Sequence, residues 1–178
     1  SRGLVGSEMC IRDRSCGGTA VTITGTNFSA PLTVTFGGTP AAATVVSSTQ
    51  IVATTPPGTA GFVTVTVNTG NPPPASMANG YQYIGVTPTV SNVNPPIDTF
   101  LGGATVTLTG SGFCPGVRVF FGGLEATPVT LISSSSLQAV VPAQIPLTCS
   151  VLAPVDLRVL NTNGTDVTVT NGFTYQPV

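Results

Sequence analysis

One pattern occurs twice in this chain, and this internal repeat constrains the fold more than any other feature. Residues 19–28 (TAVTITGTNF) recur as residues 104–113 (ATVTLTGSGF). Residues 34–38 (VTFGG) recur as 119–123 (VFFGG), and both matches are offset by 85 positions (34 to 119). Because ordered motifs that recur together report a repeated structural unit, the chain is expected to contain two copies of one module.

Further matches follow in the same order along both copies. Residues 47–56 (SSTQIVATTP) correspond to 134–142 (SSSLQAVVP), and residues 80–83 (GYQY) correspond to 172–175 (GFTY) at an offset of 92 (80 to 172). The growth of the offset from 85 to 92 places insertions between the matched motifs. The largest insertion is expected at Ala143–Leu152 of the second copy.

Alternation of apolar residues with threonine predicts short β-strands separated by Gly and Pro turns. In the segment TVTLT, Val106 and Leu108 are expected to point inward while the threonines face water, and Val21 and Ile23 repeat this arrangement. About seven such strands per copy are typical of a β-sandwich. In the second copy we expect strands near residues 89–94, 104–110, 117–122, 128–133, 136–141, 154–161 and 166–176.

The ordered set of motifs resembles the IPT/TIG family, and the resemblance covers residues 17–178. It implies an all-β fold of two tandem immunoglobulin-like β-sandwiches. The family occurs in plexins and related receptors, in some transcription factors, and in many bacterial surface proteins. In polysaccharide-acting enzymes it is accessory to a separate catalytic domain.

The two copies differ at their beginnings. The second copy starts with residues 88–96 (PTVSNVNPP), the family's first strand and proline turn, and the first copy has no equivalent. Residues 1–14 instead resemble the translation of a sequencing-library adapter, and we expect them to be a disordered lead-in; the alternatives are a polar lead-in or a short strand at 4–5. The expected organisation is therefore a truncated first repeat at 15–85, with an open sheet edge, and a second repeat at 86–178.

The charge pattern excludes several classes of function. The chain has five Arg or Lys, six Asp or Glu and no His, and five of these eleven charges lie in the first 14 residues. The remainder cannot supply the clustered positive charge that nucleic acids require. Without His, no His-based triad or His metal site is possible. No apolar run approaches the roughly 20 residues of a membrane-spanning helix, so no membrane span is expected.

The remaining acidic residues suggest no enzyme. Asp98, Glu125, Asp156 and Asp166 are each isolated in the sequence, whereas a glycosidase needs two facing carboxylates. Asp166, with nearby Asn161 and Asn163, has oxygen atoms that could contribute to a calcium site, but Asn and Asp also favour hairpin turns, which is the preferred interpretation. We therefore predict no catalytic, cofactor-binding or metal-binding residues.

Aromatic side chains that lack a counterpart in the other copy could form a platform for a sugar ring. Phe100 and Phe120 have none, and Tyr81 would join them if its strand register turned it outward. The alternative, which we favour, is that these side chains pack in the core or at its edge.

Two of the four cysteines, Cys114 and Cys149, lie in the second copy, and a disulfide between them would suit an exported protein. Against this pairing, the loops that contain them are expected at opposite ends of a sandwich, unless the Ala143–Leu152 insertion folds back. Free thiols are the alternative. Cys16 could have its partner upstream of residue 1.

These observations predict a non-catalytic spacer module of an exported or cell-surface multidomain protein, with neighbouring repeats of the same chain as its partners. The first alternative is an adhesion module that binds a glycan or a surface protein. The second is an accessory domain of a secreted polysaccharide-acting enzyme. An extracellular or cell-surface location is expected in all three cases.

Overall fold

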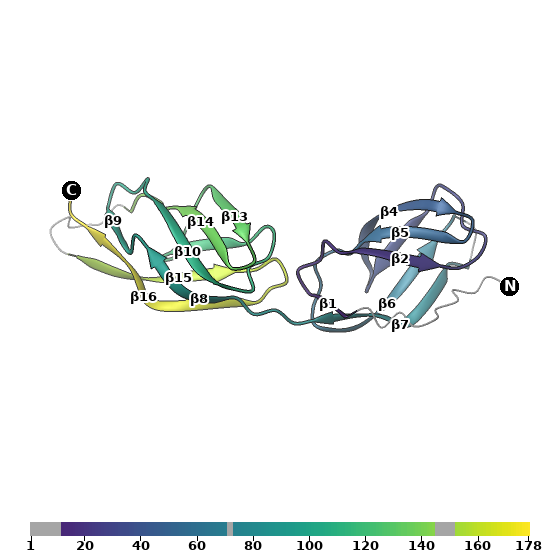
Figure 1. The fold of residues 1–178 in the computed structure, drawn as a ribbon. Coiled ribbons are helices and arrows are strands. Elements are labelled where there is room, and N and C mark those ends of the chain that lie inside the picture. Colours follow the sequence, from purple (N-terminus) through teal and green to yellow (C-terminus); the bar gives the residue numbers. More distant parts are fainter. Residues whose placement is uncertain (1–11, 71–72, 145–151) are drawn as a thin grey trace. The chain divides into compact units, whose positions relative to one another are not determined.

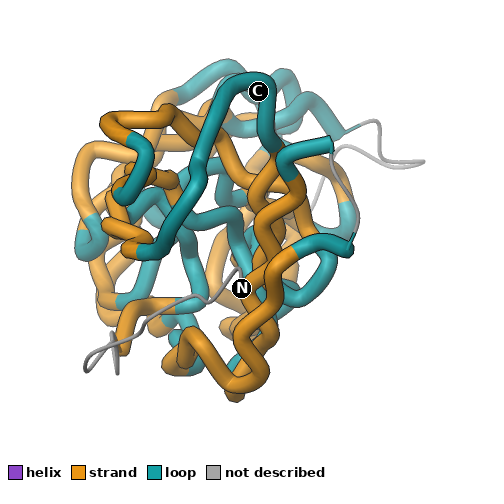
Figure 2. Tube along the Cα trace, turned by 90° about the vertical axis from the view of Figure 1, so that its right-hand side faces the viewer, coloured by secondary structure: helices purple, strands orange, loops and turns teal. Residues whose placement is uncertain are grey.

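The computed structural model describes residues 12–70, 73–144 and 152–178. The chain divides into two compact units, residues 1–85 and 86–178, which we call module 1 and module 2. The described residues form strands, turns and loops only, as the tube view shows (Figure 2). The prediction of an all-β fold is confirmed. No helix in these described stretches is long and apolar enough to cross a membrane.

Module 1 is a sandwich whose two layers are joined by one long strand (Figure 1). The first part of β4 pairs with β3, and its second part pairs with β5. One layer therefore has the order β1-β7-β6-β3-β4, and the other continues as β4-β5-β2. The strands of module 1 are β1 (Arg12–Arg14), β2 (Ala20–Thr24), β3 (Thr33–Phe36), β4 (Thr39–Ser47), β5 (Gln50–Thr54), β6 (Gly61–Asn68) and β7 (Ala75–Ile84).

Module 2 has the same layers as two separate sheets, with the orders β13-β14-β10-β8 and β12-β11-β15-β16-β9. The counterpart of β4 is divided here into β12 and β13. The strands of module 2 are β8 (Thr89–Asn94), β9 (Ile97–Thr99), β10 (Thr105–Ser111), β11 (Arg118–Phe121), β12 (Leu124–Glu125), β13 (Val129–Ser133), β14 (Ser136–Val140), β15 (Ala153–Leu160) and β16 (Asp166–Gln176).

Among the described residues of module 2, seven of the nine strands match the predicted ranges to within about one residue at each end. The two short strands β9 and β12 were missed because two or three residues are too few for a period-two pattern. The glycine pairs behave as expected for tight turns. Gly37 and Gly38 have φ of 58° and 87°, and Gly122 and Gly123 have 57° and 88°.

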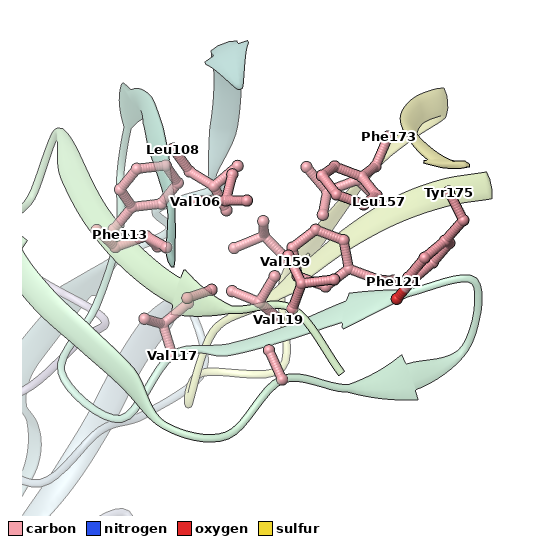
Figure 3. Close-up of a cluster of buried hydrophobic side chains, with 14 of the residues drawn as sticks. Val106, Leu108, Phe113, Val117, Val119, Phe121, Leu157, Val159, Phe173 and Tyr175 are labelled. Atoms are coloured by element: carbon pink, nitrogen blue, oxygen red, sulfur yellow. The ribbon is translucent and has the colours of Figure 1, made fainter. Parts of the chain in front are cut away.

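Each module has its own hydrophobic core, formed by the inward-facing residues of both layers. In module 2, Val106 and Leu108 of β10 face Val159 of β15 and Phe121 of β11 (Figure 3), and all four are fully buried. In module 1, Val21 and Ile23 are buried in the equivalent way. The faces that alternation predicted for these residues are thus the observed ones.

The beginning of module 1 differs in part from the prediction. Arg12–Arg14, which were assigned to the lead-in, form β1 and pair in parallel with Gln82–Ile84 of β7. Backbone groups make this pairing, so it does not require a particular side-chain pattern. The equivalent strand of module 2 is β9, which pairs in parallel with β16. Within the described residues module 1 has no counterpart of β8, and β2 is the last strand of its layer.

Candidate functional site

One polar row crosses the outer face of the larger sheet of module 2. Phe120 of β11 lies directly opposite Glu125 of β12 on one side and Arg158 of β15 on the other. Arg158 in turn lies opposite Thr168 of β16. Because residues in register have neighbouring side chains on the same face, these four form a line across four strands, which we call the Phe120 row.

Two members of this row, Glu125 and Arg158, form ion pairs with charged residues beside it. Arg118 donates from Nε to Oε1 of Glu125 and from Nη2 to Oε2, both at 2.6 Å. Arg158 donates from Nε to Oδ2 of Asp166 at 2.6 Å. The bond from Arg118 holds the pKa of the Glu125 carboxyl below its usual value, and the bond to Glu125 raises the pKa of Arg118. All four side chains remain 40–53% exposed, so the pairs serve to orient groups more than to stabilise the fold.

Both guanidinium groups also lie near the ring of Phe120. The Cζ atoms of Arg118 and Arg158 are 5.0 Å and 5.8 Å from the ring centroid, within the range of a cation–π interaction. The two arginines are therefore held from two directions, by a carboxylate and by the aromatic ring. Such a doubly held side chain has less conformational freedom to lose when it binds a ligand.

A shallow depression of about 700 Å³ lies beside the row. Within it, Asp156 accepts a hydrogen bond at Oδ1 from the backbone N–H of Asn171 at 2.9 Å, which fixes the carboxylate at the surface. At Gly123, in the turn after β11, a Cβ atom would meet nothing within 4 Å, so this side of the depression is open. The depression is lined by Phe120, Gly122, Gly123, Pro154, Val155, Asp156, Arg158 and Thr168.

The same face of module 1 has different chemistry. Thr35 of β3 occupies the place of Phe120, opposite Pro40 of β4 and Thr66 of β6, and Thr66 lies opposite Ser76 of β7. The row Glu125–Phe120–Arg158–Thr168 of module 2 is therefore Pro40–Thr35–Thr66–Ser76 in module 1. Since both modules form the same sandwich, the fold does not require the charges or the aromatic ring.

Of the three aromatic residues considered for a sugar platform, only Phe120 lies at the surface. Tyr81 is 1% exposed and Phe100 is 5% exposed, so both belong to the cores, and for them the core interpretation is correct. Tyr81 packs edge-on against Phe36 at 5.1 Å, and Phe100 stacks on Tyr175 at 5.8 Å. Strand register decides the outcome for Tyr81, since it sets the face to which a side chain points, whereas Phe100 lies in the turn that follows β9.

The Asn161–Asp166 segment is a structural turn. Asn161 is buried, accepts a hydrogen bond at Oδ1 from the backbone N–H of Cys114 at 3.0 Å, and donates from Nδ2 to the carbonyl of Gly112 at 2.8 Å. Asn163 donates from Nδ2 to the carbonyl of Val86. In the described part of the chain, no three metal-ligating side chains of the His, Cys, Asp or Glu type come together.

Cys114 and Cys16 are both disulfide-bonded. The backbone N–H of Cys114 donates to the side chain of Asn161, the residue that follows β15, so Cys114 lies at the end of module 2 where β15 ends. The first residue of β15 lies at the opposite end of the module. Cys149, its predicted partner, lies outside the described residues. The Cys114–Cys149 pairing stays a prediction.

The sequence did not single out the charged residues of this face because they are far apart along the chain. A signal was nevertheless present. Arg118, Phe120 and Arg158 occupy outward positions of matched strands, and the other copy has Thr33, Thr35 and Thr66 there. A comparison of the two copies restricted to outward positions would have identified them.

Comparison with known proteins agrees with this architecture. The chain matches the model of the IPT/TIG domain family twice, over residues 14–83 and 88–176. Comparison with curated protein sequences gave no match. Among solved structures, the extracellular region of plexin A4 is 21% identical with a TM-score of 0.50; the alignment covers 100% of this chain and 18% of the plexin. The chain therefore spans about a fifth of that relative, and the likeness concerns the fold alone.

Two further similar structures have lower TM-scores and carry no argument about function. The TIG domain of human nuclear factor of activated T-cells, cytoplasmic 4, is 25% identical with a TM-score of 0.42, and the match covers 51% of this chain and 89% of that one. The surface glycan-binding protein PbSGBP-B from Prevotella bryantii is 14% identical with a TM-score of 0.39, covering 98% of this chain and 40% of that one. From its two family matches and the two sandwiches that they cover, the chain belongs to the IPT/TIG domain family.

Proposed function

We propose that this chain is a non-catalytic spacer of an exported or cell-surface multidomain protein. The observation that carries the proposal is the path of the chain through module 2. The carbonyl of Val86, at the entrance, accepts hydrogen bonds from the side chains of Asn163 and Thr165, just before β16 begins. Gln176, at the exit, lies at the other end of this 11-residue strand. The entrance and exit are thus separated by roughly 35 Å, as a module that extends a chain requires.

The pairing of β9 with β16, the last strand of module 2, supports a role under tension. β9 and β16 run in parallel, and Thr174 donates from its backbone N–H to Pro96 while Phe100 donates to Gln176, both at 3.0 Å. A force applied at the two ends loads these bonds together in shear, because neighbouring parallel strands are pulled in opposite directions. Bonds that share a load resist it better than bonds that open one at a time.

The engagement of the carboxylates supports a non-catalytic role. Asp98 accepts hydrogen bonds from the backbone N–H groups of Thr99 and Ala104, at 2.7 Å and 3.1 Å. Glu125 and Asp166 are paired with arginines, and Asp156 holds the N–H of Asn171. Each of these four groups therefore already has a structural partner.

The proposed location rests on the chemistry of the chain. Disulfide bonds such as those of Cys16 and Cys114 persist in oxidising compartments outside the cytosol. Threonine-rich outward faces and low charge are compatible with an exposed, repetitive surface structure. The neighbouring repeats of the same protein would be the immediate partners.

Single-molecule force spectroscopy tests the proposal. The full chain is stretched between reference domains in the presence of a reductant, because the disulfide of Cys114 would otherwise shorten the released length. Module 2 is then expected to unfold in one discrete event that releases roughly 300 Å for the 89 residues from 88 to 176. Module 1 is expected to yield at a lower force, since its described layer ends at β2 without a counterpart of β8. Gradual extension of module 2 without a discrete event would contradict a spacer that resists tension.

The full-length reading frame distinguishes the spacer proposal from the alternative of an accessory domain in a polysaccharide-acting enzyme. A catalytic domain for polysaccharides encoded in the same frame would replace the spacer proposal with an accessory role. Further repeats on either side would support the spacer.

A further inference from the structure

We propose that the outer face of β11, β15 and β16 in module 2 is a binding site for a neutral oligosaccharide. The site comprises the Phe120 row, Asp156 and the depression beside them. This inference goes beyond the spacer role, and it can fail without affecting it.

The distribution of charge is the first argument. Outside the first 14 residues the chain has only six charged side chains. Five of the six lie on this face: Arg118, Glu125, Asp156, Arg158 and Asp166. Module 1 has the same sandwich with Thr33, Thr35 and Thr66 in place of Arg118, Phe120 and Arg158. Since the fold does not require five charged side chains on one face, we attribute their concentration there to the binding of a ligand.

The kind of groups defines the ligand. Two guanidinium groups and three carboxylates give the face a formal charge of 2 − 3 = −1, which disfavours phosphates, uronates and other polyanions. The carboxylates accept and the guanidiniums donate hydrogen bonds in fixed planar geometries. A sugar has vicinal hydroxyl groups, each of which both donates and accepts, so it is complementary to such alternating groups.

The shape of the face fits a short sugar chain. The depression of about 700 Å³ lies within the range of small-molecule sites, roughly 300–1,000 Å³. Phe120 forms an apolar part of its wall, against which the C–H groups of a pyranose ring can pack, and the space beside Gly123 is open, since a Cβ atom there would meet nothing within 4 Å. A continuous exposed apolar patch would favour a protein partner, whereas five charged side chains lie on this face.

Titration of the full chain with cellohexaose, mannohexaose and maltohexaose, followed by NMR amide shifts and calorimetry, tests the proposal. At least one of these neutral probes is expected to bind and to shift the amides of Phe120, Arg158 and Thr168. The amides of Thr35 and Thr66 in module 1 are expected to stay unchanged and serve as an internal control. This mapping needs no variant, so it does not depend on how a substitution affects folding.

Two variants replace residues of module 2 by the threonines that occupy the equivalent positions of module 1. Phe120→Thr and Arg158→Thr are each expected to weaken binding roughly tenfold, the loss of one packing or hydrogen-bonding contact. Thr35→Ala, the matched control on module 1, should leave affinity unchanged. A force-induced unfolding event like that of the parent chain would show that each variant keeps its fold, independently of binding.

The inference would be overturned if none of the three probes bound, if the amide shifts on binding fell outside this face, or if polygalacturonate bound in preference to the three probes. Capture of a protein by this face in place of a sugar would also overturn it. None of these results would bear on the spacer proposal, which rests on mechanical behaviour.

Discussion

The Tyr175 hydroxyl donates a hydrogen bond to the carbonyl oxygen of Pro142 across 2.8 Å and so connects the last strand of module 2 to the chain that follows β14. Module 1 repeats the arrangement, with Tyr83 donating to Pro56 at 2.7 Å. The two tyrosines have equivalent places in the repeated GxxY motif. Because both modules have this hydrogen bond between segments that are distant in sequence, we infer that it stabilises the fold of each module.

Removing either hydroxyl should destabilise the module that contains it. Tyr175→Phe keeps the buried ring but leaves the Pro142 carbonyl without this donor, and we expect a loss of about 1 kcal/mol in the free energy of unfolding of module 2. Tyr83→Phe is expected to have a similar effect on module 1 only. Calorimetric melting of the two variants measures this, and unchanged transitions in both would contradict a stabilising role.

Because the pKa of Tyr175 is raised in the folded chain, we expect module 2 to lose stability at alkaline pH. Burial, and secondarily the negative charge of Asp98, raise the pKa of Tyr175 to about 12 from its usual value near 10. The unfolded chain therefore loses this proton at lower pH than the folded one. The resulting stability is fully present below about pH 10 and is lost as the pH rises through about 12. Denaturant unfolding of the parent chain and Tyr175→Phe across this range measures it; parallel curves would contradict the shift.

Gly110 is expected to be essential for the docking of β8. A Cβ atom at this position would collide with the backbone carbonyl of Thr89 on β8, which cannot move without breaking the pairing. Gly110→Ala should cost about 1–3 kcal/mol and expose the amides of β8 to hydrogen exchange.

Gly25, the equivalent position of module 1, is the matched control. There a Cβ atom would meet the ring of Phe28, a side chain that can shift. The cost of Gly25→Ala should therefore be smaller. Equal costs for the two glycines would refute the explanation by strand docking.

Cys16 and Cys114 are expected to resist alkylation until the protein is reduced, because both are disulfide-bonded. Mass spectrometry of non-reduced peptides would identify their partners. A peptide that joins Cys114 to Cys149 would confirm the predicted pair, and any other partner of Cys114 would exclude it. Alkylation of Cys114 without reduction would contradict the bonded state.

Much of the architecture could be predicted because its signals are local. Alternation of apolar and polar residues along a strand indicates which side chains point inward. The five residues 105–109 (TVTLT) were therefore enough to predict that Val106 and Leu108 are buried. Because Val21 and Ile23 occupy the equivalent positions of the other copy, the repeat predicted that they are buried as well. Very short strands such as β9 have too few residues for this signal.

The sequence by itself determined that there are two copies of one all-β module, and which faces of most strands are buried, because motif order and period-two alternation are properties of the chain. Only the tertiary structure decided which outward residues are neighbours. Phe120 meets Arg158 because β11 pairs with β15 in one register, and that register is set by contacts between distant segments. In the same way, the register of β6 and β7 in module 1 buried Tyr81, whereas the register of β11 and β15 in module 2 left Phe120 at the surface.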